Sequence, residues 1–162
     1  MAQSLVQNYI HIIFSTKQRE PLIQPPYETE LHSYIGGTCK QLDCQPIITG
    51  GYTDHIHVLC MLSKKIALVK LVEEIKKESS KWMKTKHESL CNFYWQDGYG
   101  AFSVNPSEID IVKTYILINT NTTAKKLSRT NTGLFLKNIR LNMMSVMFGI
   151  SAHFIEVAPS GQ

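Results

Sequence analysis

Two short apolar segments joined by a glycine turn constrain the fold of this chain more than any other feature. Residues 44–51 (CQPIITGG) and 55–62 (HIHVLCML) have the length of strands, and Gly50 and Gly51 close the first of them. Apolar runs of this length, bounded by turn residues, are typical of β-strands, and two that lie so close in the chain pair as a hairpin. We therefore expect a sheet that contains this hairpin.

The rest of the chain alternates between strand patterns and helix patterns. Strand patterns cover residues 5–16 and 99–104, and helix patterns cover residues 27–42, 66–86 and a stretch that begins near residue 106. The resulting order is strand, helix, strand, strand, helix, strand, helix. This order predicts an α+β fold, in which helices pack on an antiparallel sheet.

The composition is that of a globular domain without a membrane span. The chain has 162 residues, 43% of them hydrophobic and 19% charged, which fits a single domain with a buried core. No apolar run approaches the roughly 20 residues that cross a bilayer, and the N-terminus has no secretion signal, so we expect a cytoplasmic protein. The net charge of +4 permits a polyanionic partner without requiring one. The cysteines form no CxxC pair, which argues against a zinc knuckle or a disulfide framework; they are Cys39, Cys44, Cys60 and Cys91.

The histidines of the second hairpin strand form a candidate metal site. Alternate side chains of a strand share a face, so His55 and His57 are expected to project together while Ile56 turns into the core. Two neutral imidazoles side by side can hold a divalent cation. An isolated pair of this kind is more often two satisfied histidines at a strand edge. Assignment as ligands therefore depends on further chemistry nearby.

The start of the last helix is clearly marked. Asn105 suits the N-cap, Pro106 the first helical position, and Glu108 the reciprocal partner of a capping box. We expect a helix over about residues 106–120.

Tyr115 in this helix is a candidate nucleophile. The apolar stripe formed by Ile109, Val112 and Ile116 is expected to pack on the sheet. Tyr115 and Asn119 are four residues apart, so they lie one above the other on a neighbouring face. The spacing alone favours a simpler interpretation, in which Tyr115 is a partly buried packing aromatic.

The order of several motifs along the chain decides between these interpretations. FST, GYTDHIHVLC, LVEEIKKESSKW, FYWQDGYGAFSV and VKTYI follow one another between about residues 7 and 117. In this order and spacing they resemble the single-tyrosine HUH transposases of bacterial insertion sequences, the TnpA-like family of the 200/605 group. HUH denotes histidine, hydrophobic residue, histidine, which is His55, Ile56 and His57 here.

The resemblance implies both a fold and a chemistry. It implies a ferredoxin-like sheet on which His55 and His57 hold Mg²⁺ or Mn²⁺, with the metal polarising a phosphodiester of single-stranded DNA. Tyr115 would attack the phosphorus, leaving a 5′-phosphotyrosine and a free 3′-hydroxyl. Members of the family act as homodimers, in which the tyrosine helix of one subunit completes the histidine site of the other. They recognise DNA hairpins near the ends of the element.

The lysine-rich helix is the expected DNA-binding element. Lysines on this helix can contact backbone phosphates, although a solvated helix face explains them equally well; they are Lys76, Lys77, Lys81 and Lys84. The remaining histidines have no partner at ligand spacing and are expected to be structural or surface residues; they are His11, His32, His87 and His153.

The chain departs from the family pattern after Ile116. The family has a glutamine that completes the metal site, and Asn119, one methylene shorter, stands at that spacing here. Back-translated codons of residues 119–124, read one frame over, yield Tyr-Gln-His-His-Arg, the cluster that the family has and this chain lacks. We therefore divide the chain into a transposase domain, residues 1–117, and an atypical tail, residues 118–162, and hypothesise that a one-base deletion put the tail out of frame.

Two alternatives to an active transposase remain open. One is a catalytically impaired remnant that binds single-stranded or hairpin DNA without cutting it. The other is an unrelated metal-dependent phosphoesterase, which would need further converging ligands. Only Asp54 lies near the histidine pair in the sequence, so this alternative ranks last.

Overall fold

The two segments predicted as a hairpin do pair with each other. The structure is a computed structural model that describes residues 4–120 of the chain. Strand β2 (Gln45–Tyr52) runs antiparallel to β3 (His55–Met61), and the register places Gly50 opposite His57 and Tyr52 opposite His55. The glycine-rich end of β2 therefore lies beside both histidines.

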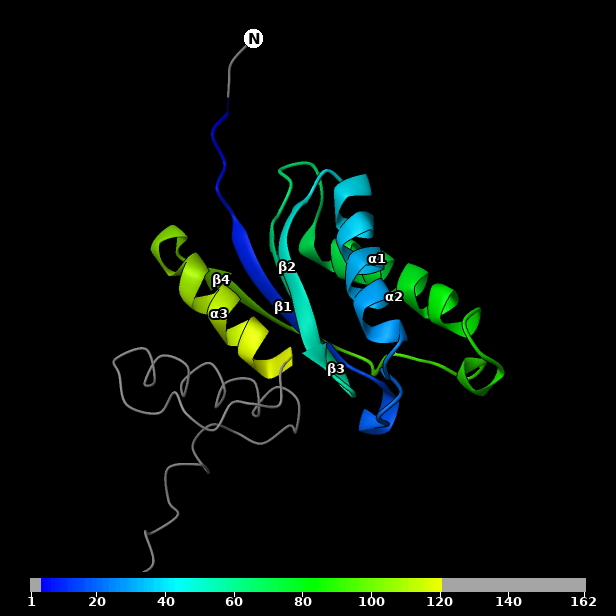
Figure 1. The fold of residues 1–162 in the computed structure, drawn as a ribbon. Coiled ribbons are helices and arrows are strands. Elements are labelled where there is room, and N and C mark those ends of the chain that lie inside the picture. Colours follow the sequence, from blue (N-terminus) through cyan, green and yellow to red (C-terminus); the bar gives the residue numbers. More distant parts are fainter. Residues whose placement is uncertain (1–3, 121–162) are drawn as a thin grey trace, which may run out of the picture.

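Strand β3 lies inside a four-stranded antiparallel sheet. Strand β1 (Tyr9–Ser15) pairs with β3 on one side and with β4 (Gly100–Val104) on the other, giving the order β2-β3-β1-β4 (Figure 1). Together with the two helices between the strands, this is the β-α-β-β-α-β arrangement of ferredoxin-like folds. The predicted α+β class is confirmed.

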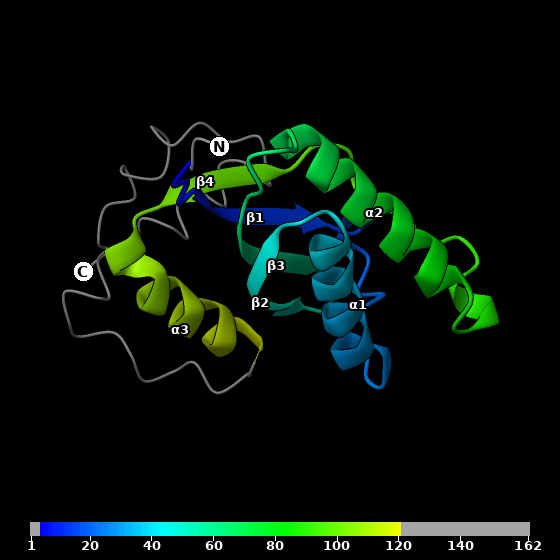
Figure 2. The same ribbon diagram turned by 90° about the horizontal axis from the view of Figure 1, so that it is seen from above.

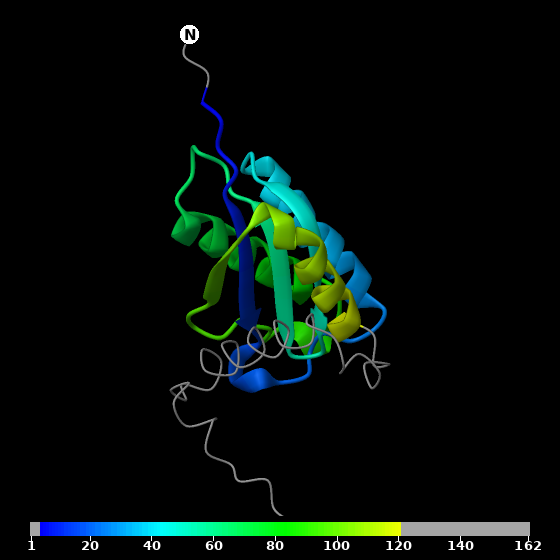
Figure 3. The same ribbon diagram turned by 90° about the vertical axis from the view of Figure 1, so that its left-hand side faces the viewer.

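The helices cover both faces of the sheet. Helices α1 (Tyr27–Gln41) and α2 (Leu68–Lys84) pack on one face, and α3 (Ile109–Thr120) lies on the opposite face (Figures 2 and 3). Among the described residues, no helix has the length and the apolar run that crossing a membrane requires.

Strand alternation separates the apolar side chains into two cores. Ile10, Ile12 and Phe14 of β1 belong to the larger core under α1 and α2, whereas Ile13 belongs to a smaller core under α3. His11 lies between these isoleucines in the chain and is also buried. A polar side chain thus occupies the middle of an otherwise apolar strand.

The predicted element boundaries need small corrections. The first strand is shorter than predicted, because it begins at Tyr9 and Leu5 is 90% exposed. Asn105 does cap the last helix, but its side-chain oxygen accepts from the backbone N–H of Ser107 at 3.1 Å. The predicted helix begins with a short 3₁₀ turn, η3 (Pro106–Glu108), and α3 itself starts at Ile109.

Candidate active site

One face of the sheet presents both histidines of the predicted metal pair to α3. The rings of His55 and His57 lie with centroids 5.1 Å apart, and Ile56 between them is fully buried in the opposite core. His57 is fully buried and His55 is partly exposed. The predicted sharing of one face by the two imidazoles is therefore confirmed.

His11 of the central strand is the direct partner of His57. Its Nε2 lies 3.0 Å from Nδ1 of His57, and the two rings stack with centroids 5.2 Å apart. The sequence spacing gives His11 no partner, but antiparallel pairing brings β1 next to β3 and supplies one. Ile13 is the direct cross-strand neighbour of His57, and His11 is its diagonal neighbour on the same face.

Burial keeps these two histidines neutral. It lowers the pKa of His11 to about 4. Burial also lowers the pKa of His57 well below its ordinary value, and repulsion from His11 and His55 adds to the effect. Neutral imidazole is the form that binds a metal ion.

A carboxylate orients His55. Its Nδ1 lies 2.7 Å from Oδ1 of Asp54, and the other oxygen of Asp54 accepts from Arg19 Nε at 2.8 Å. Burial raises the pKa of Asp54, but the hydrogen bonds from His55 and Arg19 outweigh it and hold that pKa below its ordinary value. Asp54 is therefore a carboxylate at neutral pH, and it fixes His55 with Nδ1 as donor and Nε2 as the nitrogen left for a ligand.

Tyr115 meets the histidines from the helix above. Its ring lies edge-on to that of His57, with centroids 5.6 Å apart, and 6.3 Å from the ring of His11. The predicted apolar stripe of α3 holds it there, since Val112 and Ile116 are buried in the smaller core. The structure thus brings together a tyrosine and a histidine pair that are about 60 residues apart in the chain.

A glycine in β2 lets α3 approach the sheet closely. A Cβ placed on Gly50 would lie 2.6 Å from Cγ2 of Ile116 and 2.7 Å from Oγ1 of Thr120. Any side chain at this position would push the helix away. Since Gly50 is the cross-strand neighbour of His57, this contact sets how near the tyrosine helix comes to the histidines.

Asn119 lies one turn beyond Tyr115, as predicted. Its Nδ2 donates to the backbone carbonyl of Tyr115 at 3.1 Å, so its amide is engaged within its own helix. The residues of the proposed tail beyond position 120 lie outside the described residues, and so does His153.

The site fits a divalent metal ion in part. Nε2 of His57 is a buried nitrogen with no hydrogen-bond partner among residues 4–120. A bound cation would satisfy this nitrogen. In the same part of the chain, no three side chains of His, Cys, Asp or Glu converge as a metal site. Within residues 4–120, His55 and His57 can therefore supply two nitrogens but no third side chain of these four types joins them.

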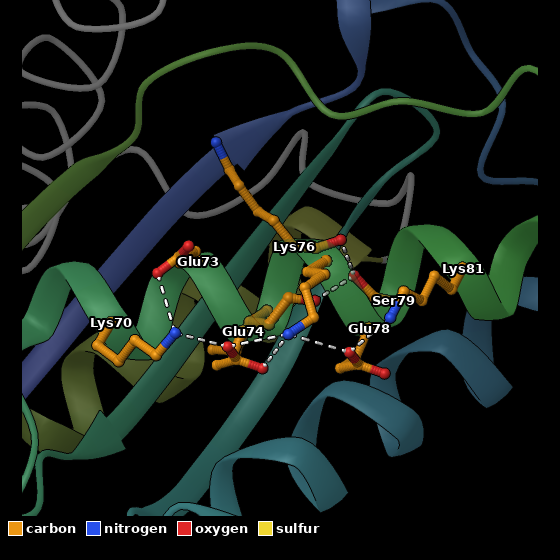
Figure 4. A network of polar contacts seen from close by, with 9 residues as sticks. Lys70, Glu73, Glu74, Lys76, Glu78, Ser79 and Lys81 are labelled. Carbon is orange, nitrogen blue, oxygen red and sulfur yellow. Dashed lines mark hydrogen bonds and ion pairs between the residues drawn. The ribbon is translucent and has the colours of Figure 1, made fainter.

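The lysines of α2 divide into two groups. Lys70, Lys77 and Lys81 pair with the acidic side chains of the same helix face, Glu73, Glu74 and Glu78, at 2.8–3.5 Å. Lys76 points away from this row (Figure 4). Its Nζ donates to the backbone carbonyls of Gln96 and Gly98, and burial lowers its pKa.

Lys84 lies at the end of α2, with Nζ 3.7 Å from the ring centroid of Tyr94. Tyr94 is 51% exposed, so this cation–π pair faces solvent. Of the four lysines predicted to bind phosphate, Lys84 is thus paired with a ring, Lys77 and Lys81 with carboxylates, and Lys76 with the loop before β4.

Comparisons with known proteins give one family match and solved structures of similar fold. The family model described as "Transposase IS200 like" matches residues 4–119. No curated protein matches the chain. A crystal structure of a protein from Deinococcus radiodurans R1, named as a transposase, is similar with a TM-score of 0.57 at 16% identity, over 75% of this chain and 98% of that one.

A second solved structure is that of a REP-associated tyrosine transposase bound to a REP hairpin. It is similar with a TM-score of 0.53 at 17% identity, over 74% of this chain and 70% of that one. At these identities both likenesses are likenesses of fold.

Proposed function

Because the chain belongs to the IS200-like transposase family, we propose that it cleaves and rejoins single-stranded DNA, with Tyr115 as the nucleophile. The observation that carries this proposal is the contact between Tyr115 and His57, whose ring centroids lie 5.6 Å apart. A phosphate held at the histidine pair would lie within reach of a residue that can attack it.

The proposed reaction is a phosphodiester exchange. The phenol oxygen of Tyr115 forms a bond to phosphorus, and the bond from phosphorus to the 3′ oxygen breaks. The phenol proton leaves to solvent, and the departing 3′ oxygen takes up a proton. A 5′-phosphotyrosine results, and attack by another 3′-hydroxyl reverses the step, so strands are rejoined without an energy source such as ATP.

His55 and His57 would hold the divalent metal, Mg²⁺ or Mn²⁺, and we propose Asn119 as a third ligand. When bound, such an ion supplies Lewis-acid stabilisation of charge on the phosphate oxygens. We call this pair of ligands, His55 and His57, the metal seat. The chain's own residues orient it: Asp54 fixes the ring of His55, and α3 excludes water from the buried side of His57. The Nδ2 of Asn119 donates to the Tyr115 carbonyl, so Oδ1 is the atom of this amide that would reach the ion.

Hairpin-bearing single-stranded DNA is the proposed substrate. The REP-associated relative is bound to a hairpin, and the net charge of +4 suits a polyanion. We propose the lysines of α2 as phosphate contacts, and a homodimer as the working assembly.

The experiment is a covalent trapping assay. A hairpin-bearing single strand labelled on the 3′ side of the cleavage position is incubated with the protein and Mn²⁺, then run on a denaturing gel. We expect a protein–DNA adduct that is lost in Tyr115→Phe and retained in the matched control Tyr99→Phe, a partly exposed tyrosine on the loop before β4. An adduct that persists in Tyr115→Phe overturns the assignment of the nucleophile.

A binding-only remnant is the second candidate. It is favoured by Asn119, which is one methylene shorter than the glutamine that the resemblance implies at this spacing. The same assay separates the two candidates, since the remnant shifts the DNA on a native gel but forms no adduct. Sequencing the gene tests the proposed frame change in the tail.

A further inference from the structure

We propose that His11 is a positioning residue for the metal seat, which holds His57 in the one tautomer that presents a bare Nε2 to a cation. This inference rests on the proposed function, because it takes His57 as a metal ligand. It adds a residue that the histidine–hydrophobic–histidine motif does not contain.

The hydrogen bond between the two rings can be made in only two ways. Between two neutral imidazoles a single proton can lie between Nε2 of His11 and Nδ1 of His57, which are 3.0 Å apart. If His11 donates, then His57 carries its proton on Nε2. If His57 donates, then its Nε2 carries a lone pair.

The burial of Nε2 favours the second arrangement. With His11 as donor, a buried N–H of His57 would have no acceptor among the described residues. An orphaned buried N–H is rarer in proteins than an under-used acceptor. With His57 as donor, the buried atom is an unshared electron pair, which a cation satisfies on binding.

The placement of His11 also argues against a packing role. Its neighbours in β1 are apolar, and it is 1% exposed, so an aliphatic residue would fill this position at less cost in desolvation. His55 has the same kind of support, since Asp54 accepts from its Nδ1. The two ligands would then be oriented alike, one through a carboxylate and the other through a neutral imidazole.

The first test uses the metal-free protein. Long-range ¹H–¹⁵N spectra of the imidazole rings report which nitrogen of His57 carries the proton. We expect Nδ1–H in the native chain, loss of that single tautomer in His11→Phe, and its return in His11→Gln, whose carbonyl can accept. An Nε2–H form of His57 in the native chain overturns the proposal, whether or not the Phe variant folds.

The second test measures affinity for Mn²⁺ alone, by electron paramagnetic resonance and without DNA. We expect roughly 10- to 100-fold weaker binding in His11→Phe, partial recovery in His11→Gln, and no change in the control His32→Phe on α1. Equal affinity in native and His11→Phe proteins overturns the proposal. If the native chain binds no Mn²⁺ yet shows the Nδ1–H tautomer, the metal seat of the proposed function fails while the His11 hydrogen bond stands.

Discussion

Tyr115 and His57 contact each other within a single chain, edge to face, with ring planes at 89°. Within one chain, the ring of the proposed nucleophile thus lies beside a proposed metal ligand. The resemblance to HUH transposases implies a tyrosine contributed by the partner. The two arrangements give opposite results when inactive variants are mixed.

We expect no complementation between the two halves of the site. Tyr115→Phe lacks the nucleophile and His57→Ala lacks a ligand, so neither forms the DNA adduct alone. If both groups act within one chain, a mixture of the two variants stays inactive in the trapping assay. Adduct formation in the mixture would show that tyrosine helices are exchanged between subunits.

Removing the charge of Asp54 is expected to weaken the metal seat. In Asp54→Asn the carboxylate that accepts from His55 Nδ1 and from Arg19 is lost, and the ring of His55 is less well oriented. We expect Mn²⁺ affinity to fall roughly 10- to 100-fold, as measured by titration without DNA. Asp43→Asn, which removes an exposed partner of Lys65, is the matched control and should leave the affinity unchanged.

A side chain at Gly50 is expected to displace α3. The Cβ of Gly50→Ala would overlap Ile116 and Thr120, so we expect a loss of about 1–3 kcal/mol in the free energy of unfolding, together with weaker adduct formation. Gly37→Ala on α1 is the control, since nothing lies within 4 Å of its Cβ. That change should stabilise the fold by about 0.5–1 kcal/mol in urea denaturation, because alanine favours a helix interior. Equal effects of the two substitutions would refute the close approach of α3.

Acid is expected to destabilise the fold through its buried histidines. Burial lowers the pKa of His32 to about 4, with its Nε2 unpaired among the described residues. Between pH 6.5 and 4 the unfolded chain binds this proton and the folded chain does not, so stability falls as pH falls. Above pH 6.5 both forms are neutral, and this contribution is constant.

His32→Gln isolates that effect. The slope of unfolding free energy against pH should decrease by about one proton's contribution between pH 6 and 5, while the variant keeps the slope that comes from His11 and His57. Urea denaturation at each pH measures it. An unchanged slope in the variant would show that His32 is protonated equally in both states.

The lysines of α2 are expected to differ in role. Lys76→Met removes the donor to the carbonyls of Gln96 and Gly98, so we expect a loss of about 1–2 kcal/mol in stability. Lys81→Gln breaks only an exposed ion pair, which is worth less than about 1 kcal/mol. If Lys81 contacts phosphate, that variant lowers the salt dependence of DNA binding by about one ion, measured by fluorescence anisotropy. A Lys76→Met protein of native stability would contradict its structural role.

The sequence predicts what depends on local periodicity. The strand pattern places His55 and His57 on one face, and the helix pattern places Val112 and Ile116 against the sheet; both are confirmed. These features follow from the geometry of one strand and one helix, without knowledge of what they pack against.

What the sequence alone did not reveal depends on pairing between distant segments. His11 lies 46 residues before His57, and only the register of β1 with β3 brings the rings together. A histidine within the apolar run YIHIIFS was a signal, since a buried polar group needs a partner. Likewise, helical spacing cannot show that Lys76 binds the loop before β4 while its neighbours pair along the helix.

The two hydrophobic cores, one on each face of the sheet, differ in size and in the helices that cover them. The larger one lies under α1 and α2 and draws on β1, β3 and the loop before β4, whereas only the smaller one involves α3. If the proposed frame change is present, it lies downstream of every segment that forms the larger core. A copy of the element that had lost transposition in this way would therefore still encode the larger core, and its product could be kept for DNA binding alone.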